Sequence, residues 1–119
     1  MSDNVFFESE IVQSSLEDIT CLQSEVMMFA QYGLYATVEE QMYNLKVLRL
    51  LLDKQRNMFV RCMLSDSDEA KELADEIVAH FVKFGYDSEM DPMELFDLMS
   101  ISIDEAEQDL KDGKYGMDT

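Results

Sequence analysis

Residues 37–64 read TVEEQMYNLKVLRLLLDKQRNMFVRCML, a run of 28 residues without Gly or Pro. Thr37 and Glu40 have the spacing of a capping box, in which both side chains accept hydrogen bonds from free backbone N–H groups at a helix start. We therefore predict one helix here, about 40 Å long. Apolar side chains recur along the run at helical spacing: Met42, Leu45, Leu48, Leu52, Phe59 and Met63.

A second long helix is predicted over residues 8–32. Gly33 follows it and is a candidate for a left-handed helix cap. Because only residues 33–36 separate the two long helices, we expect them to pair as an antiparallel hairpin. The apolar stripe of this helix contains Val12, Leu16, Ile19, Val26 and Ala30.

Two shorter helices are predicted in the second half of the chain. Apolar periodicity from Leu73 to Phe81 predicts a helix over residues 68–84, and Gly85 is its stop signal. Asp91 before Pro92 has the pattern of a cap followed by the first helical residue, which predicts a helix over residues 92–111. No segment shows the alternation of a β-strand.

The predicted fold is therefore all-α: a long antiparallel helical hairpin, 8–32 and 37–64, with two shorter helices, 68–84 and 92–111, packed on it. At 119 residues the chain has the length of one domain. We expect its core to span about residues 6–112, followed by a flexible tail at residues 113–119.

The chain is strongly acidic, and its charged residues are unevenly distributed along the sequence. The chain has a net charge of −17, yet residues 37–64 hold five bases against three acids, a net charge of +2. Such a field repels phosphates and anionic lipid, so we expect neither nucleic-acid nor membrane binding. The acidity is explained either by solubility alone or by basic partners.

The sequence contains no motif that indicates catalysis. It has no glycine-rich phosphate loop and no Cys-x-x-Cys, and its one histidine, His80, lacks the companions that a metal site needs. We expect no enzyme activity, no cofactor and no bound metal. The start of the chain does not resemble a signal peptide, so we expect a cytoplasmic protein whose Cys21 and Cys62 are reduced, buried thiols.

Two features are candidates for protein recognition. Phe6 and Phe7 are too apolar to be left in water, so they either cover the core or meet a partner. Lys46, Arg49 and Arg56 belong to the basic helix 37–64, where they either pair with acids of helices 8–32 and 68–84 or form a recognition stripe. The ten methionines are open to two similar interpretations, as core filler or as the lining of a binding groove.

FFESEIVQ, residues 6–13, closely resembles the opening of a small all-helical domain family of unknown function found in cyanobacteria and their phages. The resemblance extends to about residue 110, through weaker matches at Glu40–Met42, Arg56–Arg61, Leu64–Asp66, Phe84–Gly85 and Met93–Asp97. It implies a bacterial or phage cytosol and brings no activity. It also implies a fixed place for Phe6, Phe7 and Glu10, in the core or at an interface.

The sequence thus predicts a small acidic adaptor or regulator, with Phe6, Phe7, Glu10, Lys46, Arg49 and Arg56 as its protein-binding residues. The partner is a host protein or a second copy in a homodimer. A phage-encoded protein would act on a host bacterial complex in the host cytoplasm. The alternative is an acidic nucleic-acid mimic that blocks a DNA- or RNA-binding protein, chiefly through the carboxylates of residues 68–76.

Overall fold

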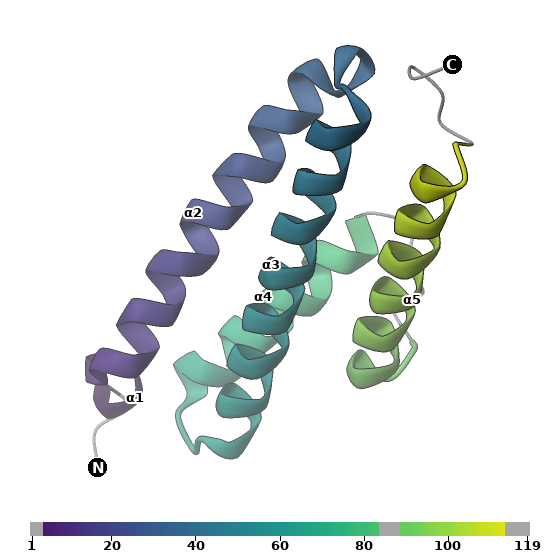
Figure 1. Ribbon diagram of the computed structural model, residues 1–119. Coiled ribbons are helices and arrows are strands. Elements are labelled where there is room, and N and C mark those ends of the chain that lie inside the picture. The colour runs from purple at the N-terminus through teal and green to yellow at the C-terminus, as the bar shows by residue number, and fades with distance from the viewer. Residues whose placement is uncertain (1–3, 84–88, 114–119) are drawn as a thin grey trace.

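The computed structural model describes residues 4–83 and 89–113, except for the side chains of Asn4, Val5, Leu34 and His80. These residues form helices and no strand, which confirms the all-α class. The predicted stop at Gly85 and most of the predicted tail lie outside the described residues. The elements are α1 (Asn4–Glu8), α2 (Glu10–Tyr32), the 3-10 turn η1 (Gly33–Tyr35), α3 (Val38–Leu64), α4 (Asp68–Lys83) and α5 (Pro92–Lys111), as Figure 1 shows.

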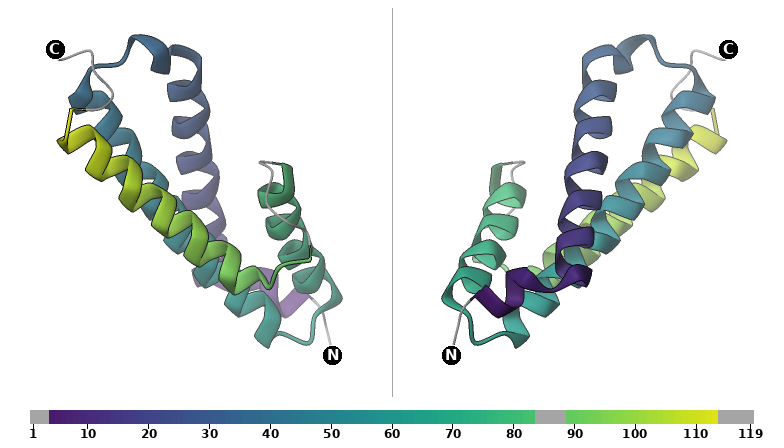
Figure 2. Two further views of the ribbon diagram at one scale, coloured as in Figure 1. Left: turned by 90° about the vertical axis from the view of Figure 1, so that its right-hand side faces the viewer. Right: turned by 90° about the vertical axis from the view of Figure 1, so that its left-hand side faces the viewer.

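Helix α3 is the centre of the fold, because α2, α4 and α5 each make their main contacts with it. α2 and α3 run in opposite directions and are joined by η1, while α5 lies along the other side of α3 (Figure 1). Figure 2 shows that α2 and α3 diverge toward η1 and that α4 stands apart from α2. The arrangement is elongated: the radius of gyration is 16.3 Å, compared with about 13.5 Å for a compact chain of this length.

The most deeply buried side chains join α3, α4 and α5. Phe96 of α5 is 1% exposed, and its ring packs edge-on against Phe81 of α4 with centroids 5.0 Å apart. Phe59 of α3 completes the cluster, with its centroid 5.8 Å from that of Phe96. Met58 and Cys62 of α3 are equally inaccessible. Helix α5, the last helix of the chain, is therefore held to α3 and α4 by aromatic packing.

Local capping fixes where the helices begin. The Glu40 N–H donates to the Thr37 hydroxyl at 3.1 Å, and the Thr37 N–H donates to the Glu40 carboxylate at 2.9 Å, which confirms the predicted capping box. Asp91 caps α5 by accepting from the Met93 N–H at 2.9 Å. Helix α4 has an equivalent cap, in which Ser67 accepts from the Ala70 N–H at 3.2 Å.

Two details of the first predicted helix were wrong. The first helix was predicted to start at residue 8, but a separate short helix, α1, covers Asn4–Glu8, and Ser9 then caps α2 by accepting from the Val12 N–H at 3.4 Å. Gly33 is not a left-handed cap, because its φ of −59° and ψ of −26° are right-handed and it opens η1. Among the described glycines the left-handed one is Gly113, whose φ is 77° and which follows Asp112, the C-cap of α5.

The cap of α5 provides a test of the fold. We expect Asp91→Ala to lower the free energy of unfolding by about 1 kcal/mol, because the Met93 N–H loses its acceptor and no other side chain replaces it. Thermal or urea unfolding followed by circular dichroism measures this. Asp66→Ala is the matched control, since it removes one exposed carboxylate that caps no helix. Equal stability of both variants would contradict the assigned start of α5.

Candidate protein-binding surfaces

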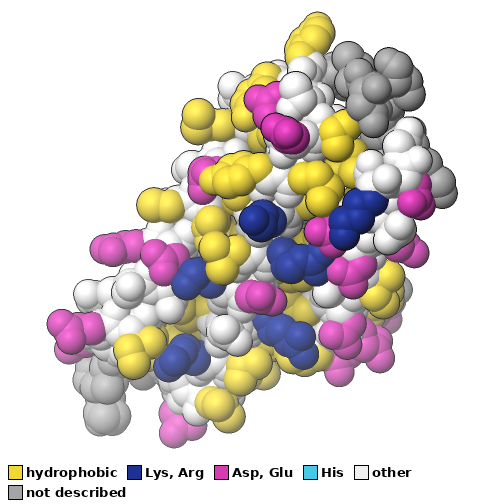
Figure 3. Space-filling model, viewed as in Figure 1, with side chains coloured by type: hydrophobic (Ala, Val, Ile, Leu, Met, Phe, Trp, Pro, Cys, Tyr) yellow, Lys and Arg dark blue, Asp and Glu magenta, His cyan; other side chains and the backbone are white. Residues whose placement is uncertain are grey.

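The basic side chains of α3 lie on one face of the molecule, where Figure 3 shows a row of Lys and Arg side chains among acidic and apolar ones. Arg49 pairs with two carboxylates of α5, Asp104 at 2.7 Å and Glu107 at 3.4 Å. Arg56 approaches Asp97 of the same helix at 3.9 Å. These pairs are partly exposed, so each contributes at most about 1 kcal/mol.

The expected acidic partners of these arginines were wrong. Arg49 and Arg56 lie seven residues apart on the side of α3 that α5 covers, so their carboxylates come from α5 and not from the helices predicted over 8–32 and 68–84. Only Lys54 follows that expectation, because it pairs with Asp18 of α2 at 3.1 Å. Lys46 is exposed and forms no ion pair with another described residue.

The predicted aromatic pair is half-buried at the other end of α3. Phe6 and Phe7 pack edge-on with centroids 4.9 Å apart, and both rest against the core. Phe6 shares a shallow hollow with Arg61. Arg61 and Arg49 are twelve residues apart on α3, a separation of about 18 Å. The six predicted binding residues therefore do not form one surface: Phe6, Phe7 and exposed Glu10 are separated from Lys46 and Arg49.

A polar contact links α2 and α3 near η1. The Tyr43 hydroxyl donates to the Glu25 carboxylate at 3.2 Å. This hydrogen bond, together with the negative charge of Glu25, raises the pKa of Tyr43 above its usual value of 10.0. Tyr43 therefore remains a neutral, exposed aromatic side chain at neutral pH, close to the basic row of α3.

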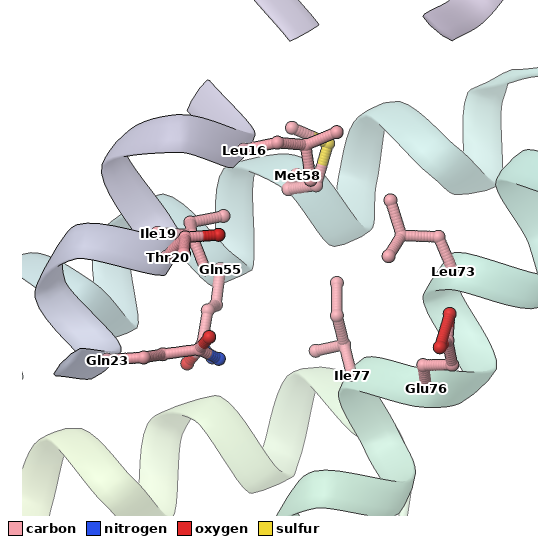
Figure 4. Close-up of a pocket in the computed structure, with 9 residues that line it drawn as sticks. All are labelled: Leu16, Ile19, Thr20, Gln23, Gln55, Met58, Leu73, Glu76 and Ile77. Carbon is pink, nitrogen blue, oxygen red and sulfur yellow. The ribbon is translucent and has the colours of Figure 1, made fainter. Parts of the chain in front are cut away.

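A groove lies between α2 and α4, because each packs on α3 and leaves a space between the two. Its volume is about 260 Å³. Met58, at the bottom, is 1% exposed, and Ile19 and Ile77 on the two sides are each 8% exposed. Figure 4 shows the nine lining residues: Leu16, Ile19, Thr20 and Gln23 from α2, Gln55 and Met58 from α3, and Leu73, Glu76 and Ile77 from α4.

Gln55 is the unusual residue of this groove. The residue as a whole is 5% exposed, and its amide forms no hydrogen bond within the described part of the chain. The amide is nevertheless not sealed off, because no fully buried side-chain N or O atom among the described residues lacks a partner. In Figure 4 the side chains of Gln23 and Gln55 both extend into the space between α2 and α4. An amide that reaches solvent at the base of a groove can hydrogen-bond to water or to a bound ligand. The groove thus combines apolar walls with a free polar group at its base.

The α4 side of the groove is acidic. Glu76 lines the groove, and Glu69, seven residues earlier, lies on the same face of α4 with Leu73 between them. Both carboxylates are exposed, and neither takes part in an ion pair among the described residues. None of the lining residues is basic. This electrostatic environment favours a cationic ligand over an anionic one.

The sequence interpretation missed this groove, although the sequence carried a signal for it. Gln55 lies three residues after Leu52 and four before Phe59, at the one position where the apolar stripe of α3 is interrupted by a polar side chain. A polar residue at a core position indicates either a hydrogen-bonded core or an opening. Which of the two applies depends on where α2 and α4 lie, and sequence spacing does not contain that information.

Comparisons with known proteins identify no relative of this chain. Neither the family models, the curated proteins nor the solved structures compared with the chain gave a match. Among residues 4–83 and 89–113, no helix is long and apolar enough to cross a bilayer. The same residues contain no cluster of three or more His, Cys, Asp or Glu side chains that would hold a metal ion.

Proposed function

We propose that the protein is a small acidic adaptor that binds an amphipathic helix of a partner protein in the groove between α2 and α4. In this proposal the helices α2 and α3 act as a long antiparallel hairpin, on which α4 and α5 are packed. The protein works by binding, without catalysis or a cofactor, in a bacterial cytoplasm. If the chain is phage-encoded, its partner belongs to a host complex.

The observation that carries the proposal is the Gln55 amide, which has no hydrogen-bond partner among the described residues and lies at the base of a groove lined in part by apolar side chains. Ile19, Met58 and Ile77 provide a surface for apolar anchors of a helix, which recur every three or four residues. The Gln55 amide would then bond with a polar side chain or backbone group of the bound helix. Because Glu76 lines the groove and Glu69 lies on the same face of α4, lysines or arginines beside the anchors would strengthen binding and speed encounter.

The test uses a helical peptide with Leu at anchor spacing and Lys on either side, labelled for fluorescence anisotropy. We expect it to bind more tightly than the same peptide with Glu in place of Lys. Thr20→Arg places a long side chain at an exposed position that lines the groove, and should weaken binding at least about tenfold. The matched control is Ser14→Arg, also exposed on α2 but about 120° around the helix from Thr20.

Two outcomes would contradict the groove as the binding site. One is tight binding that Thr20→Arg and Ser14→Arg weaken equally, since this indicates a contact elsewhere on the surface. The other is the absence of binding by the Lys peptide at high concentration. Circular dichroism of both variants checks that the helices are intact, so that lost binding is not the result of unfolding.

The nucleic-acid mimic remains a second candidate because of one observation on α4. Its first three turns present five exposed carboxylates: Asp68, Glu69, Glu72, Asp75 and Glu76. A partner with a phosphate-binding channel would meet these charges, and its binding would weaken steeply with salt. Pull-down from a cyanobacterial lysate at two salt concentrations separates the candidates. A salt-labile nucleic-acid-binding protein favours mimicry, and a salt-stable partner favours the groove.

A further inference from the structure

The outer side of α3 carries a second unoccupied surface, which we call the α3 outer stripe. Its seven residues recur at alternating steps of three and four, and all are exposed: Tyr43, Lys46, Leu50, Asp53, Asn57, Val60 and Leu64. This repeat is the seam pattern of a helix that pairs with another helix. Leu50, near its middle, is 48% exposed, and Leu64, at its end, is 82% exposed.

Two side chains of the α3 outer stripe are charged. Lys46 and Asp53 lie four residues before and three residues after Leu50, and neither forms an ion pair among the described residues. Each of the printed ion pairs instead uses Arg49, Lys54 or Arg56. The stripe therefore has an apolar centre, with one unpaired base on one side and one unpaired acid on the other.

We infer that two copies of this chain pair through their α3 outer stripes, antiparallel about a two-fold axis beside Leu50, with Lys46 of each copy facing Asp53 of the other. An axis that passes between positions 49 and 50 of both helices gives this register. The two Leu50 side chains then meet next to the axis. A parallel pairing would set Lys46 against Lys46 and Asp53 against Asp53, so the charges select the antiparallel arrangement.

The overall charge explains why self-association would use this surface. Two chains of −17 repel each other over most of their surfaces. Residues 37–64, with a net charge of +2, are the segment on which two copies approach with least repulsion. The inference does not depend on the groove, because the stripe lies on the side of α3 away from the buried Met58 and Cys62.

The test is a charge exchange measured by sedimentation equilibrium at neutral pH and low salt. The native chain should dimerise. Lys46→Asp alone and Asp53→Lys alone should each weaken the dimer at least about tenfold, because both symmetry-related pairs become repulsive. The double variant should regain most of the native affinity. An equimolar mixture of the two single variants should form a heterodimer, since each supplies the charges that the other lacks.

A second pair of variants tests the apolar centre. Leu50→Asp should abolish the dimer, whereas Ile101→Asp should leave it unchanged. Ile101 of α5 is a matched control because it is 51% exposed and lies two residues from buried Ile103, on the opposite side of that helix. A native chain that stays monomeric at high concentration would overturn the inference. So would single charge variants that dimerise like the native chain, or a mixture that forms no heterodimer.

Discussion

Replacing Phe96 with Ala is expected to lower the free energy of unfolding by about 3–5 kcal/mol, which is a large part of the stability of a domain this size. Phe96 is 1% exposed and is the side chain through which α5 meets both neighbouring aromatic rings. Its loss removes the ring contacts with Phe59 and Phe81 and leaves a cavity that three rigid helices fill poorly. Urea unfolding of the native and variant chains measures the difference.

The control for this variant is Leu98→Ala on the same helix. Leu98 is 38% exposed, so its truncation should cost less than about 1 kcal/mol. A double-mutant cycle with Phe81→Ala then isolates the ring contact itself, for which we expect a coupling of about 0.5–1.5 kcal/mol. A cost for Phe96→Ala no larger than that for Leu98→Ala would mean that α5 does not dock on α3 and α4 as described.

The sequence predicted the helices well where their boundaries depend on local chemistry. The capping box of Thr37 and Glu40 acts over three residues, and the Asp91 cap acts over two, so both are visible without a structure. The starts of α3 and α5 agree with their predicted positions to within one residue. The start predicted for α4, residue 68, also agrees with the structure.

The sequence was less informative where a feature depends on how helices pack. Gly33 was expected to be left-handed because glycine tolerates that conformation, but the chain continues into η1 with right-handed backbone angles. The partners of Arg49 were misplaced for a related reason. Periodicity indicates which side of a helix is apolar, but it does not indicate which other helix covers each side.

The groove between α2 and α4 also combines features that the sequence predicted with features that it did not. The apolar positions Leu16, Leu73 and Ile77 were correctly placed on stripes, yet the groove among them exists because α2 and α4 pack on α3 without closing on each other. Phe6 and Phe7 were expected either to cover the core or to meet a partner. Their half-buried position against the core supports the first role and leaves part of each ring accessible.

Cys62 is expected to resist thiol reagents in the folded protein while Cys21 reacts readily. Cys62 is completely inaccessible, and burial raises its pKa from 9.0 to about 11. The expectation that Cys21 is buried was wrong, because Cys21 is exposed on α2. Because the thiolate is the reactive form, the raised pKa alone reduces the reactive fraction of Cys62 about a hundredfold at neutral pH. Titration with a chromogenic disulfide should therefore show one fast thiol, and a second thiol only after denaturant is added.

Variants that retain only one of the two cysteines show which thiol reacts fast and which reacts slowly. Cys21→Ser should remove the fast phase, and Cys62→Ser should retain it. Since Cys62 belongs to the buried core, its slow reaction measures opening of that core and should accelerate with urea. Two fast thiols in the native protein would show that the core around Cys62 is open to solvent.

The raised pKa of Cys62 also predicts how stability changes with pH. The unfolded chain releases this proton near pH 9.0, whereas the folded chain keeps it until about pH 11. Between these values the unfolded state binds fewer protons, so the free energy of unfolding falls as the pH rises. The contribution is fully present below pH 9. In Cys62→Ala this component is absent, so stability should fall less steeply from pH 9 to 11 than in the native chain. Equal slopes would mean that the thiol ionises as readily in the folded protein as in the unfolded one, and that the core around Cys62 admits solvent.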